Sequence, residues 1–278
     1  MEQAITPRTK AVLVVHMCGS MARIDELMEV CKRHEVTLIE DNAQAIGGTF
    51  GGKALGTFGE AGILSFDYVK TITCGEGGAV ITDDPRVYEL VDAFTDHGHD
   101  HRGKDRGADQ HPHIGANFRI SELHAAVGLA QLRKLDRILE IQRQNQRFFL
   151  EGLADIPRLR FRAVPDPGGD SATFLTFFLP SEEDARKAAR ELAAALVDGC
   201  FYWYDNNWHY HRKWDHIKQL KSPGPLAVHK AGWLTGLTDL TMPRSDAIMS
   251  QTISMQIKLL WTRDEMAERL ARMRSVLR

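Results

Sequence analysis

The sequence is poor in cysteine, lacks long apolar runs and has almost no net charge. Its cysteines lie far apart and form no CxxC pair, at Cys18, Cys31, Cys74 and Cys200. This usage is not that of a disulfide framework and indicates a reducing, cytoplasmic location. The longest apolar runs, such as residues 11–15 and 174–179, are far shorter than the roughly 20 residues that cross a bilayer. We therefore expect no transmembrane helix.

The charges are nearly balanced, with 35 basic and 37 acidic residues and a formal net charge of -2. Such a chain has no electrostatic footprint for nucleic acid or for an anionic membrane. The expected partners are therefore small molecules and other protein chains.

The first forty residues have the pattern of a strand, a helix and a second strand. The continuous apolar run over residues 10–16 is typical of a strand covered on both faces. The run over residues 36–41 predicts the second strand. An apolar stripe at i, i+3, i+4 and i+7 lies between them, at Ile24, Leu27, Met28 and Cys31. This order predicts parallel strands joined by a right-handed crossover.

The whole chain has 278 residues, a length that suits two modest domains, and its pattern of elements indicates an α/β protein. Breaks rich in proline and glycine at 156–157 and 165–169 follow a long helical pattern, so we place the domain change in the second half of that helix. The prediction is a large domain over residues 1–140 and a smaller α+β domain over 141–278. The further expected elements are strands at 61–66 and 78–82, a helix after Pro85, the long helix at 121–153, a strand at 173–179, a helix at 185–197, a strand at 253–260 and a final helix opened by a capping box at 262–265.

The segment over residues 95–114 combines histidines with charged residues and glycines and has almost no apolar side chains. This composition predicts a long exposed loop or lid. Metal binding is the alternative, but the spacing matches no zinc pattern, and we predict no bound metal. The histidines are His97, His99, His101, His111 and His113.

The most aromatic stretch of the chain lies at residues 201–210. Its rings are compatible with a core, a binding wall or a subunit interface. The aromatic rings and the asparagines together favour a polar ligand site somewhat over plain core.

Side chains suited to chemistry lie near the ends of two neighbouring predicted strands. Asp41 ends the second strand, Ser65 lies at the end of the third, and Lys70 follows just past it. In an open parallel sheet, ligands bind outside the carboxyl ends of the strands, so Asp41 and Lys70 should face the same crevice. A pyridoxal cofactor needs a lysine for its Schiff base and a carboxylate at its pyridine nitrogen, and Ser65 could donate to its phosphate. An ordinary surface lysine is the alternative interpretation.

Several segments resemble the DegT/DnrJ/EryC1/StrS family of sugar aminotransferases, in the family's order and at its spacing. They are Ile39 to Ala45, Gly52 to Gly59, Ser65 to Lys70 with Gly75 to Thr82, and Gly115 to Glu122 with Ala125 to Leu132. The resemblance is strong over residues 5 to about 140 and weak beyond. It implies a large domain of the pyridoxal-phosphate-transferase fold type I, with a mostly parallel sheet, followed by a smaller C-terminal α+β domain. It also implies pyridoxal 5'-phosphate as cofactor.

The resemblance assigns a role to each of five residues. Lys70 would be the catalytic Schiff-base lysine and general acid/base, and Asp41 would pair with the pyridine nitrogen. Gln44 would contact the ring or its 3-hydroxyl, and Ser65 would bind the phosphate. Asn117 would reach the phosphate of the neighbouring subunit's cofactor, so that a homodimer would share its active sites. Without the resemblance, Asn117 would be an ordinary turn residue and Gln44 an ordinary polar loop residue.

The implied reaction transfers an amino group, usually from glutamate, to a keto sugar used for cell-surface polysaccharide such as lipopolysaccharide. Residues 67–77 and the aromatic stretch look most like a branch that aminates an eight-carbon keto sugar acid, the 8-amino-3,8-dideoxyoctulosonate aminotransferases. Some family members are sugar dehydratases with histidine in place of the lysine, and Lys70 argues against that activity.

The resemblance begins near the middle of the family's large domain. The part that normally comes before it carries a phosphate-binding loop and the aromatic group that stacks on the pyridine ring. We therefore expect either a fragment of a longer protein or a shortened homologue. A catalytically inactive truncated homologue that acts as an interaction partner is the alternative to an active aminotransferase.

Overall fold

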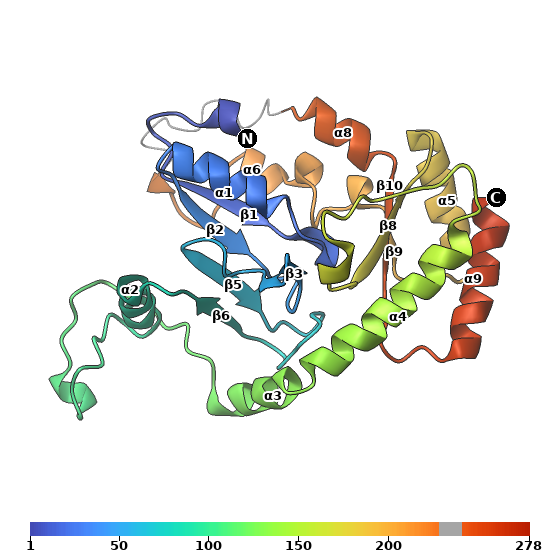
Figure 1. Ribbon diagram of the computed structural model, residues 1–278. Coiled ribbons are helices and arrows are strands. Elements are labelled where there is room, and N and C mark those ends of the chain that lie inside the picture. The colour runs from blue at the N-terminus through green and yellow to red at the C-terminus, as the bar shows by residue number, and fades with distance from the viewer. Residues whose placement is uncertain (228–240) are drawn as a thin grey trace. The chain divides into compact units, whose positions relative to one another are not determined.

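The computed structural model describes residues 1–227 and 241–278 and divides the chain into two compact units (Figure 1). The first unit comprises Met1–Gln144 and Ala163–Thr173, and the second comprises Asn145–Arg162 and Phe174–Arg278. The division after Gln144 lies four residues past the predicted boundary at 140, within one long helix. The assignment of these units as a cofactor-binding domain and a small domain stays a prediction.

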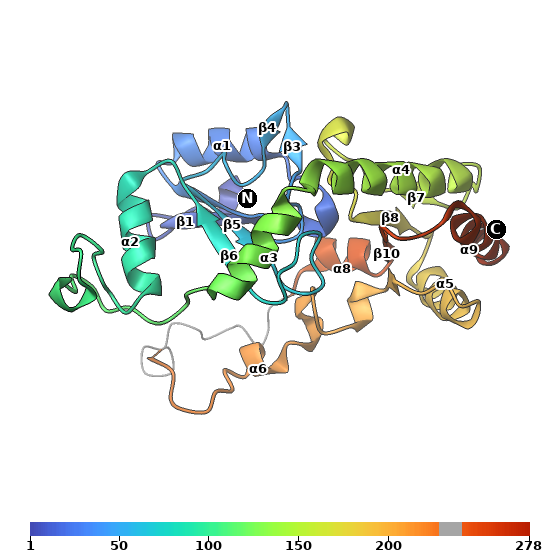
Figure 2. The same ribbon diagram turned by 90° about the horizontal axis from the view of Figure 1, so that it is seen from below.

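The first unit is built on a four-stranded sheet in the order β1-β2-β5-β6, whose strands are all labelled in Figure 1. Figure 2 shows the same sheet turned by 90°. The strands are β1 (Ala11–Val15), β2 (Thr37–Asp41), β5 (Ala61–Ser65) and β6 (Gly78–Ile81). β1, β2 and β5 are parallel, whereas β6 runs antiparallel to β5. Helix α1 (Ile24–Arg33) connects β1 to β2, so the predicted strand, helix and parallel strand are confirmed.

Helix α1 covers one face of this sheet. Its buried Ile24 and Cys31 pack against Val14 of β1 and Leu38 of β2. The prediction that β1 is covered on both faces is wrong, because Leu13 and Val15 are 57% and 46% exposed. Successive side chains of a strand point to opposite faces, and within the described residues only the face toward α1 is buried.

The other predicted elements of the first unit occur in the predicted order with one break, and the structure adds a short hairpin at residues 49–54 that was not predicted. The predicted helix over 121–153 is in fact two helices, which separate at residues 133–134. The amide of Lys134 bonds three residues back to the carbonyl of Gln131, which tightens the turn there. No proline or glycine marks this position. The elements are the hairpin β3 (Thr49–Phe50) and β4 (Lys53–Ala54), then α2 (Pro85–Thr95), α3 (Glu122–Leu132) and α4 (Leu135–Leu153), which continues into the second unit.

The second unit contains an antiparallel sheet in the order β7-β8-β10-β9. Phe177 of β8 and Met255 of β10 are fully buried in its core with Leu192 and Met273 from two helices. Thr262 forms the predicted capping box with Glu265. The elements are β7 (Arg160–Phe161), β8 (Phe174–Phe178), α5 (Glu182–Ala194), β9 (Cys200–Phe201), α6 (Asp215–Lys218), α8 (Pro243–Met249), β10 (Thr252–Gln256) and α9 (Arg263–Leu277).

The aromatic stretch at 201–210 belongs largely to the packing of this second unit. Phe201 and Trp203 stack with their ring centroids 4.5 Å apart. Trp203, Tyr204 and Tyr210 are buried, whereas Trp208 is 55% exposed. Three of the six rings in this stretch are therefore buried within the unit. No helix within the described residues is long and apolar enough to span a membrane.

Gly62 of β5 is a sensitive packing position, because a Cβ added there would overlap the carbonyl oxygen and Cα of Gly56. Gly62→Ala is expected to lower the free energy of unfolding by about 3 kcal/mol through this backbone clash. Gly224→Ala is the matched control, since nothing lies within 4 Å of its added Cβ, and it should change stability by less than about 0.5 kcal/mol. Urea unfolding measures both, and equal stability of the two variants would contradict this packing.

Candidate active site

The carboxylate of Glu40, buried in β2, connects three parts of the first unit. It accepts a hydrogen bond from Nε2 of His16, which directly follows β1, at 2.9 Å, and both side chains are fully buried. It also accepts the backbone amides of Gly56, Phe58 and Gly59 at 2.8, 2.6 and 2.8 Å. One buried side chain therefore fixes the end of β1 and the loop before β5 to β2.

The protonation of His16 follows from its two hydrogen bonds. The amide of Ala22 donates to Nδ1 at 3.2 Å, so Nδ1 carries no proton. The ring proton is therefore on Nε2, which donates to Glu40. The pair is a neutral imidazole hydrogen-bonded to a carboxylate, rather than two buried charges.

Burial disfavours the ionised form of Glu40, and the hydrogen bonds to its carboxylate favour that form. Desolvation alone would raise the pKa of this carboxyl, but the hydrogen bonds from His16 and from the amides of Gly59, Gly56 and Phe58 together lower the pKa below its usual value. Glu40 is therefore ionised in the folded protein at neutral pH.

Asp41 and Gln44 follow at the carboxyl end of β2. Asp41 is the last residue of the strand and lies in register between Val15 of β1 and Ile63 of β5. Its Oδ1 accepts the amide of Ala43 at 3.0 Å, in a turn that aims the chain away from the sheet.

Gln44 ties the loop after β2 to the loop after β1. Its Oε1 accepts the amide of Cys18 at 3.0 Å. Cys18 is buried and has a left-handed backbone with φ of 58°, a conformation that a residue with a Cβ seldom adopts. The hydrogen bond that the Cys18 amide donates to Gln44 helps hold this conformation.

Ser65 and Lys70 lie at the carboxyl end of β5 and in the loop that follows it. Ser65 is the last residue of the strand, and its Oγ accepts the amide of Asp67 at 3.4 Å. The amide of Lys70 closes a turn on the carbonyl of Asp67 at 3.0 Å. The two ends of the loop are bonded to each other. The amide of Phe66 donates to the carbonyl of Gly77, and the amide of Cys74 donates to the carbonyl of Phe66. Within residues 1–227 and 241–278, the half-buried Lys70 side chain has no hydrogen bond or ion pair.

Helix α3 and the residues before it pack against the glycines that follow Lys70. A Cβ at Gly77 would lie 2.8 Å from Cδ1 of Ile120, and one at Gly75 would lie 3.7 Å from Nε2 of His124. Gly128 of α3 likewise faces Cys74. Small residues thus let α3 support the Lys70 loop at close range.

Asn117 lies on the short segment that leads into α3. It forms an antiparallel bridge with Asp96, the residue that follows α2. Its side chain is exposed, and its Oδ1 accepts the amide of Arg119 at 3.3 Å.

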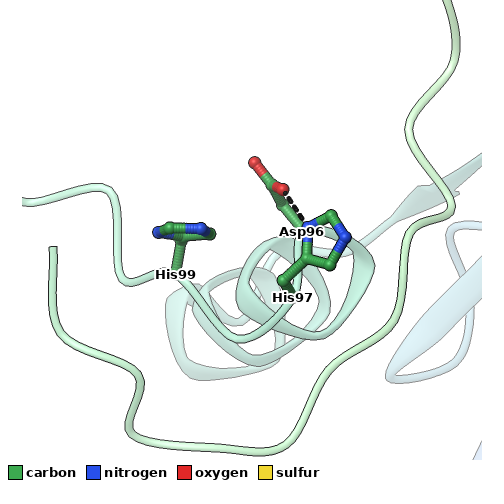
Figure 3. A group of neighbouring side chains, drawn as sticks. All are labelled: Asp96, His97 and His99. Atoms are coloured by element: carbon green, nitrogen blue, oxygen red, sulfur yellow. Dashed lines mark hydrogen bonds and ion pairs between the residues drawn. The ribbon is translucent and has the colours of Figure 1, made fainter. Parts of the chain in front are cut away.

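Asp96, His97 and His99 form a group whose potential metal-binding atoms lie within 4.8 Å of one another (Figure 3). However, Oδ1 of Asp96 already accepts His97 Nδ1 and two guanidinium groups, from Arg106 and from Arg119 at 2.6 Å. Its Oδ2 accepts Nε2 of His101 at 3.1 Å. Two fixed positive charges on the carboxylate oppose a divalent cation there. The group is better described as a hydrogen-bonded network around one buried acid.

The structure therefore brings four of the predicted site residues to adjoining strand ends. Asp41 ends β2 and Gln44 follows it. Ser65 ends β5 and Lys70 follows it, whereas Asn117 is on a separate segment of the same unit. Sequence reasoning missed His16, Glu40 and Asp96. Two acidic residues in succession at the end of an apolar strand were the available signal for Glu40, because one of them must point into the sheet's covered face.

These residues fit a pyridoxal cofactor by their chemistry. A carboxylate, a side-chain amide, a hydroxyl and a primary amine gather at two adjacent strand ends. These are the groups that a protonated pyridine nitrogen, a ring hydroxyl, a phosphate and an aldehyde require.

Comparison with known proteins identifies the family. A model described as the DegT/DnrJ/EryC1/StrS aminotransferase family matches residues 1–271. The chain belongs to this family. The resemblance found in the motifs is thus confirmed.

Several relatives of known activity are similar over most of the chain. An L-glutamine:2-deoxy-scyllo-inosose aminotransferase of Streptomyces kanamyceticus is 37% identical over 207 residues, which cover 70% of this chain and 48% of the relative. A GDP-perosamine synthase of Escherichia coli O157:H7 is 39% identical over 204 residues, which cover 71% of this chain and 52% of the relative. The chain spans about half the length of the curated relatives it matches.

Solved structures of family members share the fold. A 3-amino-5-hydroxybenzoic acid synthase is 26% identical, with a TM-score of 0.76 over 99% of this chain and 69% of that one. An E. coli GDP-4-keto-6-deoxy-D-mannose-3-dehydratase with bound hydrated PLP is 24% identical, with a TM-score of 0.79 over 100% of this chain and 69% of that one. The predicted α/β class and fold type I are confirmed.

Glu40→Gln tests the buried network beneath the site. The amide would place an N–H group against backbone N–H donors and leave an unsatisfied donor buried, so the free energy of unfolding should fall by about 3 kcal/mol at neutral pH. Because the folded pKa of Glu40 is depressed, its stabilisation is present above its usual pKa near 4.5 and is lost as the pH falls through the folded pKa. The deficit of the variant should therefore shrink in acid.

Urea unfolding between pH 7 and pH 3 would measure this effect. The control is Glu26→Gln, whose side chain is 64% exposed, and which should match the wild type within about 0.5 kcal/mol. A deficit of Glu40→Gln that stays constant across this range would contradict the assigned role of the ionised carboxylate.

Proposed function

We propose that the chain carries the catalytic half-site of a pyridoxal-phosphate-dependent sugar aminotransferase. One observation supports this most strongly. In a chain of this family, Asp41 ends β2 and Lys70 lies in the loop after β5, the parallel strand next to it. When bound, pyridoxal phosphate supplies an electron sink for proton removal next to nitrogen.

Each site residue has a distinct proposed task. The amine of Lys70 holds the cofactor's aldehyde carbon and, when released, moves a proton between carbon atoms. The carboxylate of Asp41 keeps a proton on the pyridine nitrogen. Gln44 orients the ring, and the hydroxyl of Ser65 donates to the phosphate.

The proposed substrates are a keto sugar and an amino-acid donor, with glutamate the expected donor. Relatives named for amination of 2-deoxy-scyllo-inosose and for GDP-perosamine synthesis support this class. Within it we infer an eight-carbon keto sugar acid, 8-keto-3-deoxyoctulosonate, as one candidate, for cell-surface polysaccharide. This finer inference rests on the sequence of residues 67–77 and of the aromatic stretch at 201–210.

We further infer a cytoplasmic homodimer in which Asn117 of each chain serves the other chain's phosphate. Exposed apolar side chains on the segment around Asn117 and on α3 support a partner there. Phe118 is 67% exposed and Leu123 is 81% exposed. Apolar exposure of this extent is typical of interaction surfaces.

Lys70→Ala tests the proposed cofactor attachment. Adding pyridoxal phosphate to the wild-type chain should produce a visible absorbance band that survives desalting, because the cofactor is held covalently. The variant should lack this band after desalting, whereas Lys104→Ala, a change on the exposed loop, should keep it. A folded wild-type chain that shows no band would instead favour the inactive interaction partner.

Asp41→Asn tests the proposed electronic role. Asparagine cannot hold the ring proton, so the half-reaction with glutamate should slow by at least about 100-fold, while the absorbance band remains. Stopped-flow spectroscopy measures this rate, with Asp25→Asn on the exposed side of α1 as the control. An unchanged rate would mean that another group performs this task.

A further inference from the structure

Asp96 is a buried acid at the end of α2 and lies outside the five proposed site residues. It is 6% exposed. It accepts hydrogen bonds from His97, His101, Arg106 and Arg119. Of these donors, Arg119 is far away in sequence and lies two residues after Asn117. A single carboxylate thus joins the end of α2, the histidine-rich loop and the segment of Asn117.

The backbone around Asp96 and Asn117 is paired on both sides. The amide of His97 donates to the carbonyl of Ala116 at 2.9 Å, and the amide of Phe118 donates to the carbonyl of Thr95 at 2.9 Å. The amide of Ala116 completes the ladder on the carbonyl of Phe94 at 2.8 Å. Such a short two-stranded ladder is marginal by itself, so it depends on the side chains that hold it.

Glycines allow the two segments to approach closely. A Cβ at Gly98 would overlap the carbonyl oxygen of His113, and one at Gly115 would overlap the amide nitrogen of Gly98. The rings of Phe94 and Phe118 stack across the ladder at 6.0 Å. The crossing is therefore a specific, closely packed feature within an otherwise exposed loop.

The same segment continues directly to the Lys70 loop. Ile120 contacts the position of Gly77, and His124 of α3 contacts that of Gly75. The network of Asp96 therefore holds a segment that contains Asn117 and that leads into the residues packed against the Lys70 loop.

We propose that Asp96 is a positioning residue that holds Asn117 in the orientation needed to reach a phosphate. This proposal rests on the proposed function, in which Asn117 contacts the cofactor phosphate. The backbone ladder holds Ala116 and Phe118 on either side of Asn117. The carboxylate adds a charge-assisted bond to Arg119, two residues after Asn117, and so holds the same segment through a side chain. Pre-organisation of this segment reduces the ordering that phosphate binding would otherwise require.

Hydrogen exchange of the full chain without cofactor tests the positioning directly. In Asp96→Asn, peptides covering residues 94–98 and 115–119 should exchange at least about tenfold faster than in the wild type. Peptides of β2 and β5, which belong to the same unit as Asp96, should be unchanged, which shows that this unit of the variant is folded. The control is Asp83→Asn, an exposed acid near the start of α2. If Asp96→Asn does not fold, Arg119→Gln removes the same bond from the exposed side. Unchanged exchange in a folded variant overturns the proposal.

Cofactor binding tests the path through Asn117. Asp96→Asn should weaken pyridoxal phosphate about tenfold and leave pyridoxal, which lacks the phosphate, unchanged. The effect should disappear in an Asn117→Ala background, because the two changes then remove one interaction. Equal weakening of both ligands, or additive effects, overturns the proposal.

The proposal and its premise fail in different ways. A wild-type chain that binds no pyridoxal phosphate refutes the proposed function, and hydrogen exchange alone then decides whether Asp96 holds the segment.

Metal chelation provides a further control. If a chelator applied to the wild type reproduces the faster exchange, the segment is held by a metal ion instead, and the proposal is wrong.

Discussion

The first unit depends on one buried negative charge. Glu40 is fully enclosed, and its charge is stable there only because His16 and the amides of the 56–59 loop point their N–H groups at it. That requirement fixes where β1 ends and holds the 56–59 loop against β2 just before the chain enters β5. Asp41, the next residue in the chain, inherits its position from this arrangement.

The residues of the candidate site are positioned partly by strands and partly by a loop. The acid and the hydroxyl end neighbouring strands, where backbone pairing fixes them, whereas the lysine occupies a loop closed by its own hydrogen bonds. Ile120 and α3 pack against that loop at Gly77 and Gly75, which both have a positive φ. Asp96 in turn organises the segment that leads into α3. The proposed chemistry thus rests on two buried carboxylates that take no part in it, Glu40 and Asp96.

Local patterns predicted much of this architecture. The apolar run, the helical stripe and the second run gave β1, α1 and β2, and Thr262 with Glu265 gave the capping box, because these signals lie within a few residues. Strand-end reasoning also grouped Asp41 with Lys70. The break between α3 and α4 carries no residue signal. The contact of Asp96 with Arg119 spans 23 residues in a loop without periodicity, so no local pattern records it. The uncovered face of β1 was missed because an apolar run does not show which face is covered.

The central claim is that Lys70 is the residue that holds the cofactor. The most direct measurement is borohydride reduction of the chain after incubation with pyridoxal phosphate, followed by mass spectrometry of its peptides. The account predicts one modified peptide, with the reduced cofactor on the amine of Lys70. Modification spread over exposed lysines, or a folded chain with no modification, would contradict it.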